Sequence, residues 1–220
     1  MAYVEENAKR INNWVRKFFD GPEHAGSKSD NKRYDAPPQE GVTLKPGQSD
    51  RRNAHIATAN QIRQTIRSEG KKLNGPMPAQ MGEIIFKGKF RGGNCAEMTW
   101  LCCHGFVASK AHIWVAIIDD PGDHQFCILM DKEPDYKSIE LMDYRGDDQW
   151  IIDPWAGIVC KPGEFKETFT KQMLKWTAAG KRIGVPNAKK DGYIWTPGTE
   201  TKYLDAILKS GLKFRKGWNF

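Results

Sequence analysis

The sequence lacks long hydrophobic runs, and this absence excludes two classes of protein. No stretch of its 220 residues approaches the roughly 18 consecutive apolar residues that a membrane-spanning helix needs. The opening stretch, "MAYVEENAKRINNWVRKFF", also lacks the uninterrupted apolar segment of a secretory signal. We therefore expect a protein that has no transmembrane segment and does not follow the Sec export route.

Cysteine is scarce and is not arranged in pairs. The chain has five cysteines, an odd number, without the even spacing of a disulfide-stapled secreted domain. A structural zinc site would need separated pairs such as C-x2-C, and two adjacent cysteines in one helix cannot easily direct both thiolates to one metal. The pattern predicts a reducing compartment, no disulfide bonds, and neither a metal nor another cofactor. The five residues are Cys95, Cys102, Cys103, Cys127 and Cys160.

Acidic residues are in the minority. Lysine and arginine together number 34 against 27 aspartates and glutamates, which gives a net charge of +7. This excess favours an acidic partner or an anionic surface, and six of the basic residues lie between positions 51 and 72, on what is most simply a solvated face. Charge alone does not choose among a membrane surface, a nucleic acid and an acidic protein face. It does not make nucleic acid an obligatory partner.

Polar stretches divide the chain into three parts. Residues 1–21 carry apolar side chains at the spacing of an amphipathic helix, which ends at Gly21 and Pro22. Residues 22–53 are rich in Gly, Ser, Asp, Lys and Pro and predict a flexible linker or mobile loop. Residues 54–220 form the expected catalytic domain, which opens with a second helix in "AHIATANQIRQTIRSEGKKLNG".

The compact part of the chain is predicted to be one helix followed by three strands. "GGNCAEMTWLCCHGF" places apolar side chains on one helical stripe, with Asn94 in the capping position and Cys95 in the first turn. "HIWVAIID" and "HQFCILMD" are apolar runs joined by "DPGD", a turn by composition, which predicts neighbouring antiparallel strands. "DQWIIDPWAG" predicts a third strand that ends at Asp153, because Pro154 cannot donate to a strand ladder.

Cys95 is the cysteine best placed to act as a nucleophile. Unpaired N–H groups and the positive end of the dipole at a helix N-terminus favour a thiolate. Cys102 and Cys103 lie inside the helix and Cys127 lies in mid-strand, where a small apolar filler is the simpler explanation. The pattern therefore assigns nucleophilic chemistry to Cys95.

A histidine on the second strand is the expected base. His124 opens that strand and projects to the same side as Phe126, so it can approach the start of the helix. His112 opens the first strand and is the reserve candidate. His104 lies about half a turn from Cys95 around the same helix and faces away from it.

An imidazole that acts as a base needs an acceptor to fix its tautomer and orientation. Asp153 at the end of the third strand can supply it, and Asp143 and Asp148 are the alternatives. Trp155 beside the acid can shield the imidazole and carboxylate from water. Each of the three features alone has a structural explanation, but in this order they indicate a catalytic triad.

These motifs carry a resemblance to a known superfamily. "GGNCAEM", "DHQF" and "WIIDPWAG" resemble the Cys, His, Asp series of the papain-like and transglutaminase-like superfamily, with 29 residues between Cys95 and His124 and again between His124 and Asp153. The match covers about residues 90–157 and is most similar to cysteine protease and glutamine deamidase effectors that bacterial pathogens and symbionts inject into host cells. It implies an α+β fold with a papain-like (transglutaminase-like) core, in which the helix carrying the cysteine packs on an antiparallel sheet, plus an N-terminal helical extension.

The resemblance also implies a function and a place of action. It implies a cysteine hydrolase that acts on amide bonds of a host protein, is secreted by a Sec-independent bacterial system and works in the host cytosol, or otherwise in the cytoplasm. Papain-like enzymes usually have a glutamine a few residues before the cysteine for the oxyanion hole, and here the nearest is Gln80, fifteen residues upstream. The backbone N–H of Cys95 is the alternative donor. The residues expected to bind substrate are Asn94, Trp155 and Gln80.

Three activities share this chemistry, and one alternative has none. The acyl donor is a backbone amide in a protease and a glutamine side chain in a deamidase or transglutaminase, and all pass through a thioester. We favour deamidation slightly, because a protease needs a long cleft for an extended substrate. Nearby tryptophans suggest a closed pocket: Trp100, Trp114, Trp150 and Trp155. The alternative is a non-catalytic basic adaptor that binds a partner or an anionic surface through residues 1–72.

Overall fold

The computed structural model describes residues 2–19, 32–34, 56–109, 112–119, 122–130, 138–140, 149–186 and 193–218. The helices are α1 (Ala2–Phe19), α2 (Ile56–Lys71), α3 (Pro78–Lys87), α4 (Cys95–Val107), α5 (Phe165–Ala178) and α6 (Thr201–Leu208). The strands are β1 (Lys32–Tyr34), β2 (Ile113–Ile118), β3 (His124–Leu129), β4 (Ser138–Glu140), β5 (Trp150–Asp153), β6 (Ile158–Cys160), β7 (Lys181–Pro186), β8 (Tyr193–Pro197) and β9 (Gly211–Lys216). A 3₁₀ helix, Pro162–Glu164, leads into α5.

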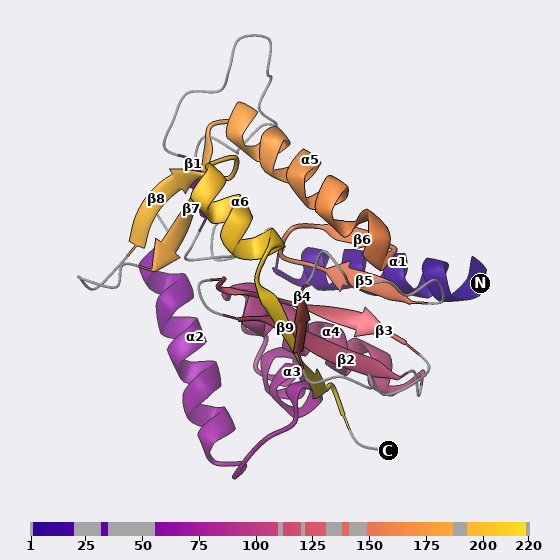
Figure 1. The fold of residues 1–220 in the computed structure, drawn as a ribbon. Coiled ribbons are helices and arrows are strands. Elements are labelled where there is room, and N and C mark those ends of the chain that lie inside the picture. The colour runs from indigo at the N-terminus through magenta and orange to yellow at the C-terminus, as the bar shows by residue number, and fades with distance from the viewer. Residues whose placement is uncertain are drawn as a thin grey trace.

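The described strands form two antiparallel sheets (Figure 1). The main sheet has six strands in the order β4-β9-β2-β3-β5-β6, and the smaller sheet has three in the order β1-β7-β8. The predicted hairpin is confirmed, with Ile118 of β2 opposite His124 of β3. The predicted third strand is confirmed as β5, which pairs with β3 and ends at Asp153. Helices and antiparallel sheets together confirm the α+β class.

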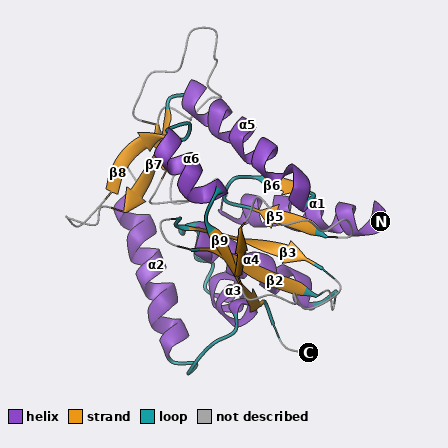
Figure 2. Cartoon of the chain, in the orientation of Figure 1, coloured by secondary structure: helices purple, strands orange, loops and turns teal. Residues whose placement is uncertain are grey.

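Helices cover both faces of the main sheet at β3 (Figure 2). On one face, Cys127 Sγ lies 3.5 Å from the Thr99 carbonyl oxygen of α4. On the other face, the Phe126 ring centroid lies 5.0 Å from that of Phe165 in α5. Because side chains alternate along a strand, His124 leaves β3 on the same side as Phe126, as the sequence predicts.

The helix α4 is buried on most of its surface. It packs on β2 and β3, and α3 and α1 pack against it in turn. Gly82 of α3 permits this close approach, because a Cβ at that position would overlap the Trp100 carbonyl oxygen. Cys95 therefore begins a helix that the fold holds firmly in place. The buried residues of α4 are Cys95, Glu97, Met98, Thr99, Leu101, Cys102, Cys103 and Phe106.

The predicted N-terminal helix is confirmed as α1, and it docks on the body of the protein. It contacts α4, β5 and β6 and contributes to the same hydrophobic cluster as the main sheet. Burial of one Ile, Val or Phe side chain contributes about 1.5–3 kcal/mol, so several such residues hold α1 against the core. Its buried apolar residues are Ala8, Ile11, Val15, Phe18 and Phe19.

Part of the predicted linker is a strand. Residues 32–34 form β1, which pairs with β7 in the register Lys32 opposite Ile183. Composition did not indicate this strand, because a three-residue strand paired with a partner far along the chain leaves no periodic pattern. The predicted mobility of the rest of residues 22–53 lies outside the described residues.

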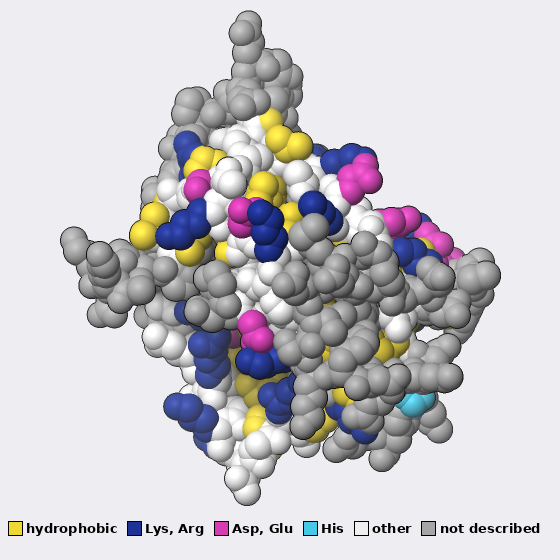
Figure 3. Space-filling view, in the orientation of Figure 1, with side chains coloured by type: hydrophobic (Ala, Val, Ile, Leu, Met, Phe, Trp, Pro, Cys, Tyr) yellow, Lys and Arg dark blue, Asp and Glu magenta, His cyan; other side chains and the backbone are white. Residues whose placement is uncertain are grey.

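Charged side chains are distributed over the surface. On the face shown in Figure 3, Lys and Arg side chains lie over several elements, with Asp and Glu side chains among them. Some of this charge is paired locally: Lys213 Nζ lies 2.6 Å from Asp119 Oδ1, and Lys209 Nζ lies 2.9 Å from Asp205 Oδ1. Among the described helices, none is both long enough and apolar enough to cross a bilayer.

Candidate active site

Local interactions fix the start of the helix that carries Cys95. Asn94 is the N-cap residue, and its backbone N–H donates to Glu97 Oε2 at 2.9 Å, which is one half of a capping box. The buried Glu97 carboxylate also accepts from Arg67 Nε of α2 at 3.2 Å. Gly93 leaves room for this carboxylate, because a Cβ there would lie 2.5 Å from Glu97 Cβ. The first turn of α4 is therefore held by backbone, carboxylate and guanidinium together.

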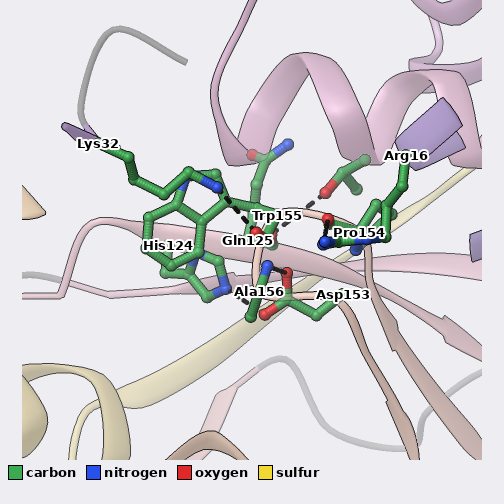
Figure 4. A network of polar contacts seen from close by, with 9 residues as sticks. Arg16, Lys32, His124, Gln125, Asp153, Pro154, Trp155 and Ala156 are labelled. Carbon is green, nitrogen blue, oxygen red and sulfur yellow. Dashed lines mark hydrogen bonds and ion pairs between the residues drawn. The ribbon is translucent and has the colours of Figure 1, made fainter. Parts of the chain in front are cut away.

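The structure brings Cys95, His124 and Asp153 together. His124 Nε2 lies 2.7 Å from Asp153 Oδ2, and both side chains are buried (Figure 4). The Cys95 side chain lies close enough to the same imidazole to help raise the pKa of His124. Since Asp153 occupies Nε2, Nδ1 is the ring nitrogen left for Cys95. The predicted helix start, strand start and strand end therefore meet around one imidazole.

A tight turn orients the Asp153 carboxylate. Asp153 Oδ1 accepts a hydrogen bond from the Ala156 backbone N–H at 2.9 Å, while its Oδ2 faces His124. The Gly157 N–H closes the turn by donating to the Asp153 carbonyl oxygen at 2.7 Å. Gly157 has φ +76°, a left-handed conformation that glycine adopts without steric cost. Both carboxylate oxygens are thus engaged, and the acid has one defined orientation.

The surroundings of His124 favour its protonated form. Burial by itself would lower the pKa of His124, because a buried imidazolium loses its hydration. The charge of Asp153 and the hydrogen bond to it outweigh burial, and the interaction with Cys95 adds to them. The net effect raises the pKa of His124 to about 10. The imidazole therefore carries a proton at neutral pH.

This shift predicts how stability depends on pH. A pKa raised by folding stabilises the protein fully below the unfolded value of 6.5, and the contribution is lost as the pH rises through about 10. We expect the free energy of unfolding of the wild type to fall between pH 6.5 and 10 by several kcal/mol more than that of His124→Gln. Urea unfolding at each pH measures the free energy of unfolding of both proteins. Subtracting one from the other cancels the contribution of titratable groups that both proteins contain. Parallel curves would contradict the prediction.

Aromatic rings enclose the imidazole. The His124 ring centroid lies 5.0 Å from that of Trp155, 5.9 Å from Phe169 of α5 and 6.0 Å from Phe126. Trp155 is only 1% exposed, so it packs against the imidazole and shields it from water. The shielding expected of Trp155 is therefore in place, while its contact with substrate and that of Asn94 remain predictions.

Sequence reasoning missed Tyr203. Its helix α6 approaches the start of β3, because a Cβ on Gly122 would lie 2.6 Å from the Ala206 carbonyl oxygen of α6. Burial of the Tyr203 hydroxyl, followed by the nearby negative charges of Cys95 and Asp153, raises its pKa well above 10. Tyr203 is therefore a neutral hydroxyl within electrostatic reach of Cys95 and Asp153. A single tyrosine in an eight-residue helix carries no sequence signal that would have identified it.

Three of the other cysteines, Cys102, Cys127 and Cys160, have raised pKa values. Burial raises the pKa of Cys102 and Cys127, and burial together with the charge of Glu164 raises the pKa of Cys160 to about 12. Cys95 is 7% exposed, whereas Cys102 and Cys127 are 0% exposed and Cys160 is 4% exposed. These differences agree with the assignment of the nucleophile to the helix start.

The structure gives Gln80 a different role from the one expected. Its side-chain oxygen accepts from the Met77 backbone N–H at 2.7 Å, at the start of α3, and the side chain is exposed. The adjacent Ala79 N–H donates to the Gly217 carbonyl oxygen at 2.9 Å. Gly217 pairs with the start of β2, at the end of the sheet opposite His124. Gln80 therefore caps α3 and is not brought to the site. The expectation was wrong because the position of Gln80 in the sequence does not show where its helix packs.

The alternative bases are remote from the site. His112 lies just before β2, and Ile118 at the other end of that strand is the residue opposite His124. The six residues from His112 to Ile118 correspond to about 20 Å at the rise of a strand. His104 packs against an aromatic ring of α3, which confirms that it faces away. The alternative acids, Asp143 and Asp148, lie outside the described residues.

In the described part of the chain, no group of three or more His, Cys, Asp and Glu side chains is arranged to hold a metal ion. Comparison of the chain with protein-family models, with curated proteins and with solved structures finds no match.

Proposed function

We propose that the protein is a cysteine-dependent amide hydrolase with a papain-like (transglutaminase-like) core. The observation that carries this proposal is the meeting of Cys95 and Asp153 at the His124 imidazole, with 29 positions between Cys95 and His124 and 29 between His124 and Asp153. Packing of the three elements does not by itself require that these three polar side chains lie next to one another. Their types and order match the roles of nucleophile, base and orienting acid.

Each residue has a defined step in the proposed reaction. Cys95 Sγ attacks the carbonyl carbon of an amide and forms a tetrahedral intermediate. His124 gives its proton to the leaving nitrogen, the C–N bond breaks, and a thioester with Cys95 remains. His124, now neutral, takes a proton from water, whose oxygen attacks the thioester and releases a carboxylic acid and the Cys95 thiolate, so that His124 is again protonated. Asp153 holds the ring orientation throughout.

Two groups are available for the oxygen that becomes negative during attack. The backbone N–H of Cys95 lies in the first turn of α4, where N–H groups have no partner within the helix. The Tyr203 hydroxyl stays protonated because burial and nearby negative charges raise its pKa, so it is a hydrogen-bond donor. We propose that these two groups, in place of Gln80, form the oxyanion hole.

Glutamine deamidation is the reaction that we propose within this class. It is supported by the enclosure of the reacting groups: Cys95 is 7% exposed and His124 4% exposed, with aromatic rings around the imidazole. One inserted side chain suits such enclosed reacting groups better than an extended backbone. Of the tryptophans expected to form the pocket, Trp155 contacts His124. Trp150 lies at the other end of β5, about 10 Å along the strand.

The resemblance of the motifs leads us to propose a host protein as substrate, met in the host cytosol after Sec-independent secretion from a bacterium. The competing class is a basic adaptor without catalysis. Its predicted binding region includes α1, whose apolar face is covered by the protein's own core, so a partner would have to bind the polar face or the basic residues that follow.

Mass analysis of treated proteins tests the proposed function. Candidate host proteins and glutamine-containing peptides are incubated with the wild type and with Cys95→Ala, and their intact masses, termini and released ammonia are measured. We expect ammonia release and conversion of Gln to Glu in an uncut chain, with the wild type only. New termini specific to the wild type would instead show a protease. Identical products with both proteins, and no thiol that alkylates faster than a free cysteine, would favour the adaptor.

A further inference from the structure

Two cations from the N-terminal region bind the turn that follows the candidate acid (Figure 4). Arg16 of α1 donates from Nη1 to the Pro154 carbonyl oxygen at 3.0 Å. Lys32 of β1 donates from Nζ to the Trp155 carbonyl oxygen at 2.9 Å. These successive carbonyl groups lie between Asp153 and Ala156, whose N–H holds the Asp153 carboxylate. The two contacts come from residues more than 120 positions away in sequence.

Both cations are fitted to this turn. The Arg16 guanidinium lies over Gly157, so closely that a Cβ there would overlap it. Lys32 Nζ lies 4.4 Å from the Trp155 ring centroid and 4.8 Å from that of Trp176 in α5, which are cation–π distances. Lys32 therefore contacts both the backbone carbonyl group and the indole ring of Trp155. That ring packs against His124.

The geometry gives these contacts a consequence for the triad. Asp153 Oδ1 is bound to the backbone of the turn and Oδ2 to His124, so any rotation of the turn moves the carboxylate relative to the imidazole. A peptide unit is planar, and a carbonyl fixed by a charged donor fixes the N–H on the other side of the same peptide bond. The N–H of the peptide whose carbonyl Lys32 binds is the Ala156 N–H. The contact with Lys32 thus reaches Asp153 through one rigid group.

We propose that Arg16 and Lys32 are positioning residues for Asp153, so that the candidate active site is complete only when the N-terminal region is docked. The inference rests on the proposed function of Cys95, His124 and Asp153. It extends that function by making α1 and β1 part of the catalytic unit, although they precede the nucleophile by more than 60 residues. Displacement of this region by a partner or by cleavage would switch the site off.

The direction in which the pKa of His124 changes in variants of Arg16 and Lys32 distinguishes a positioning role of the two cations from a purely electrostatic one. Removing a nearby positive charge by itself makes an imidazolium more stable and raises the pKa of the imidazole. Loosening the contact between Asp153 and His124 has the opposite effect, because that contact supplies the main stabilisation of the protonated ring. The other titratable groups that interact with His124 or Asp153 are Cys95, Cys102, Cys160 and Tyr203, and the substitutions leave these unchanged.

The experiment is an NMR titration of the His124 ring in the wild type and in four variants. Lys32→Met keeps the aliphatic stem and removes the donor, Arg16→Gln removes the guanidinium, and Lys32→Arg restores a cation. Lys17→Ala is the matched control, because Lys17 is an exposed cation next to Arg16 in the same helix. We expect the pKa of His124 to fall by about one unit in Lys32→Met and in Arg16→Gln, and to stay at the wild-type value in Lys17→Ala and largely in Lys32→Arg.

Alkylation of Cys95 provides a second measurement that needs no substrate. At neutral pH we expect iodoacetamide to react about 10- to 100-fold more slowly with Lys32→Met than with the wild type, since small displacements of a catalytic group have effects of this size. An unchanged or raised pKa of His124 in a folded Lys32→Met protein would overturn the inference. If Arg16→Gln fails to fold, Lys32→Met decides alone. Slow alkylation in the wild type itself would contradict the proposed function, while the titration would still test the positioning of Asp153.

Discussion

Replacing Cys95 with alanine is expected to abolish turnover. The nucleophile is lost entirely, and removal of the nucleophile of a catalytic triad lowers the rate by roughly 10⁶-fold. The free energy of unfolding should change by no more than about 1 kcal/mol, because the side chain is small and lies at the edge of the core. The rate is measured on the substrate identified by mass analysis, and unfolding by urea.

Cys102→Ala is the matched control, since it removes a thiol from the same helix at a fully buried position. We expect it to lose stability but to retain the chemistry of the wild type. Iodoacetamide at mildly acidic pH should label Cys95 first in both the wild type and this control. Preferential labelling of Cys127, or turnover by Cys95→Ala, would contradict the assignment of the nucleophile.

Replacing Asp153 with asparagine is expected to lower kcat by about 10³- to 10⁴-fold while leaving KM nearly unchanged. An asparagine oxygen can still accept from the Ala156 N–H, but its amide nitrogen would then face His124 Nε2. The imidazole would have to present an unprotonated Nε2 to that amide, so the ring would be neutral and could no longer be the protonated partner of Cys95. Steady-state kinetics with the wild type and the variant measure both parameters.

Asp123→Asn is the control for this prediction, because Asp123 is an exposed carboxylate one residue before His124. It should keep nearly full kcat. We expect His124→Ala to lose activity, as Asp153→Asn does. An inactive His112→Ala combined with an active His124→Ala would overturn the assignment of the base, as would a variant at Asp153 that changes KM alone.

The parts of the fold that sequence predicted are those set by local patterns. The spacing of apolar residues gave α1 and α4, and alternating or apolar runs bounded by turn residues gave β2, β3 and β5. Cys95, His124 and Asp153 were identifiable because each stands at an end of one of these elements, where backbone groups and side chains are free to take part in chemistry. The order of the elements then limited which of these ends could meet.

The parts that sequence did not predict depend on packing between distant segments. Arg16 and Lys32 are two among 34 basic residues, and only the docking of α1 and β1 places them on the turn after Asp153. Tyr203 comes under the charges of Cys95 and Asp153 because α6 packs against Gly122, two residues before His124. Gln80 was assigned to the site from its distance along the chain, and the packing of α3 instead places it at the other end of the main sheet.

The position of β9 in the main sheet has a consequence for how the protein matures during its synthesis. β2 lies between β3 and β9, so almost the whole second half of the sequence is translated between the two strands that pair. Until residues 211–216 emerge from the ribosome, one edge of β2 has no partner, and the sheet that supports α4 is open. Non-local pairing of this kind folds slowly. A nascent chain therefore carries the Cys95 thiol before it carries the finished sheet beneath α4, so the candidate site forms only after residues 211–216 have been made.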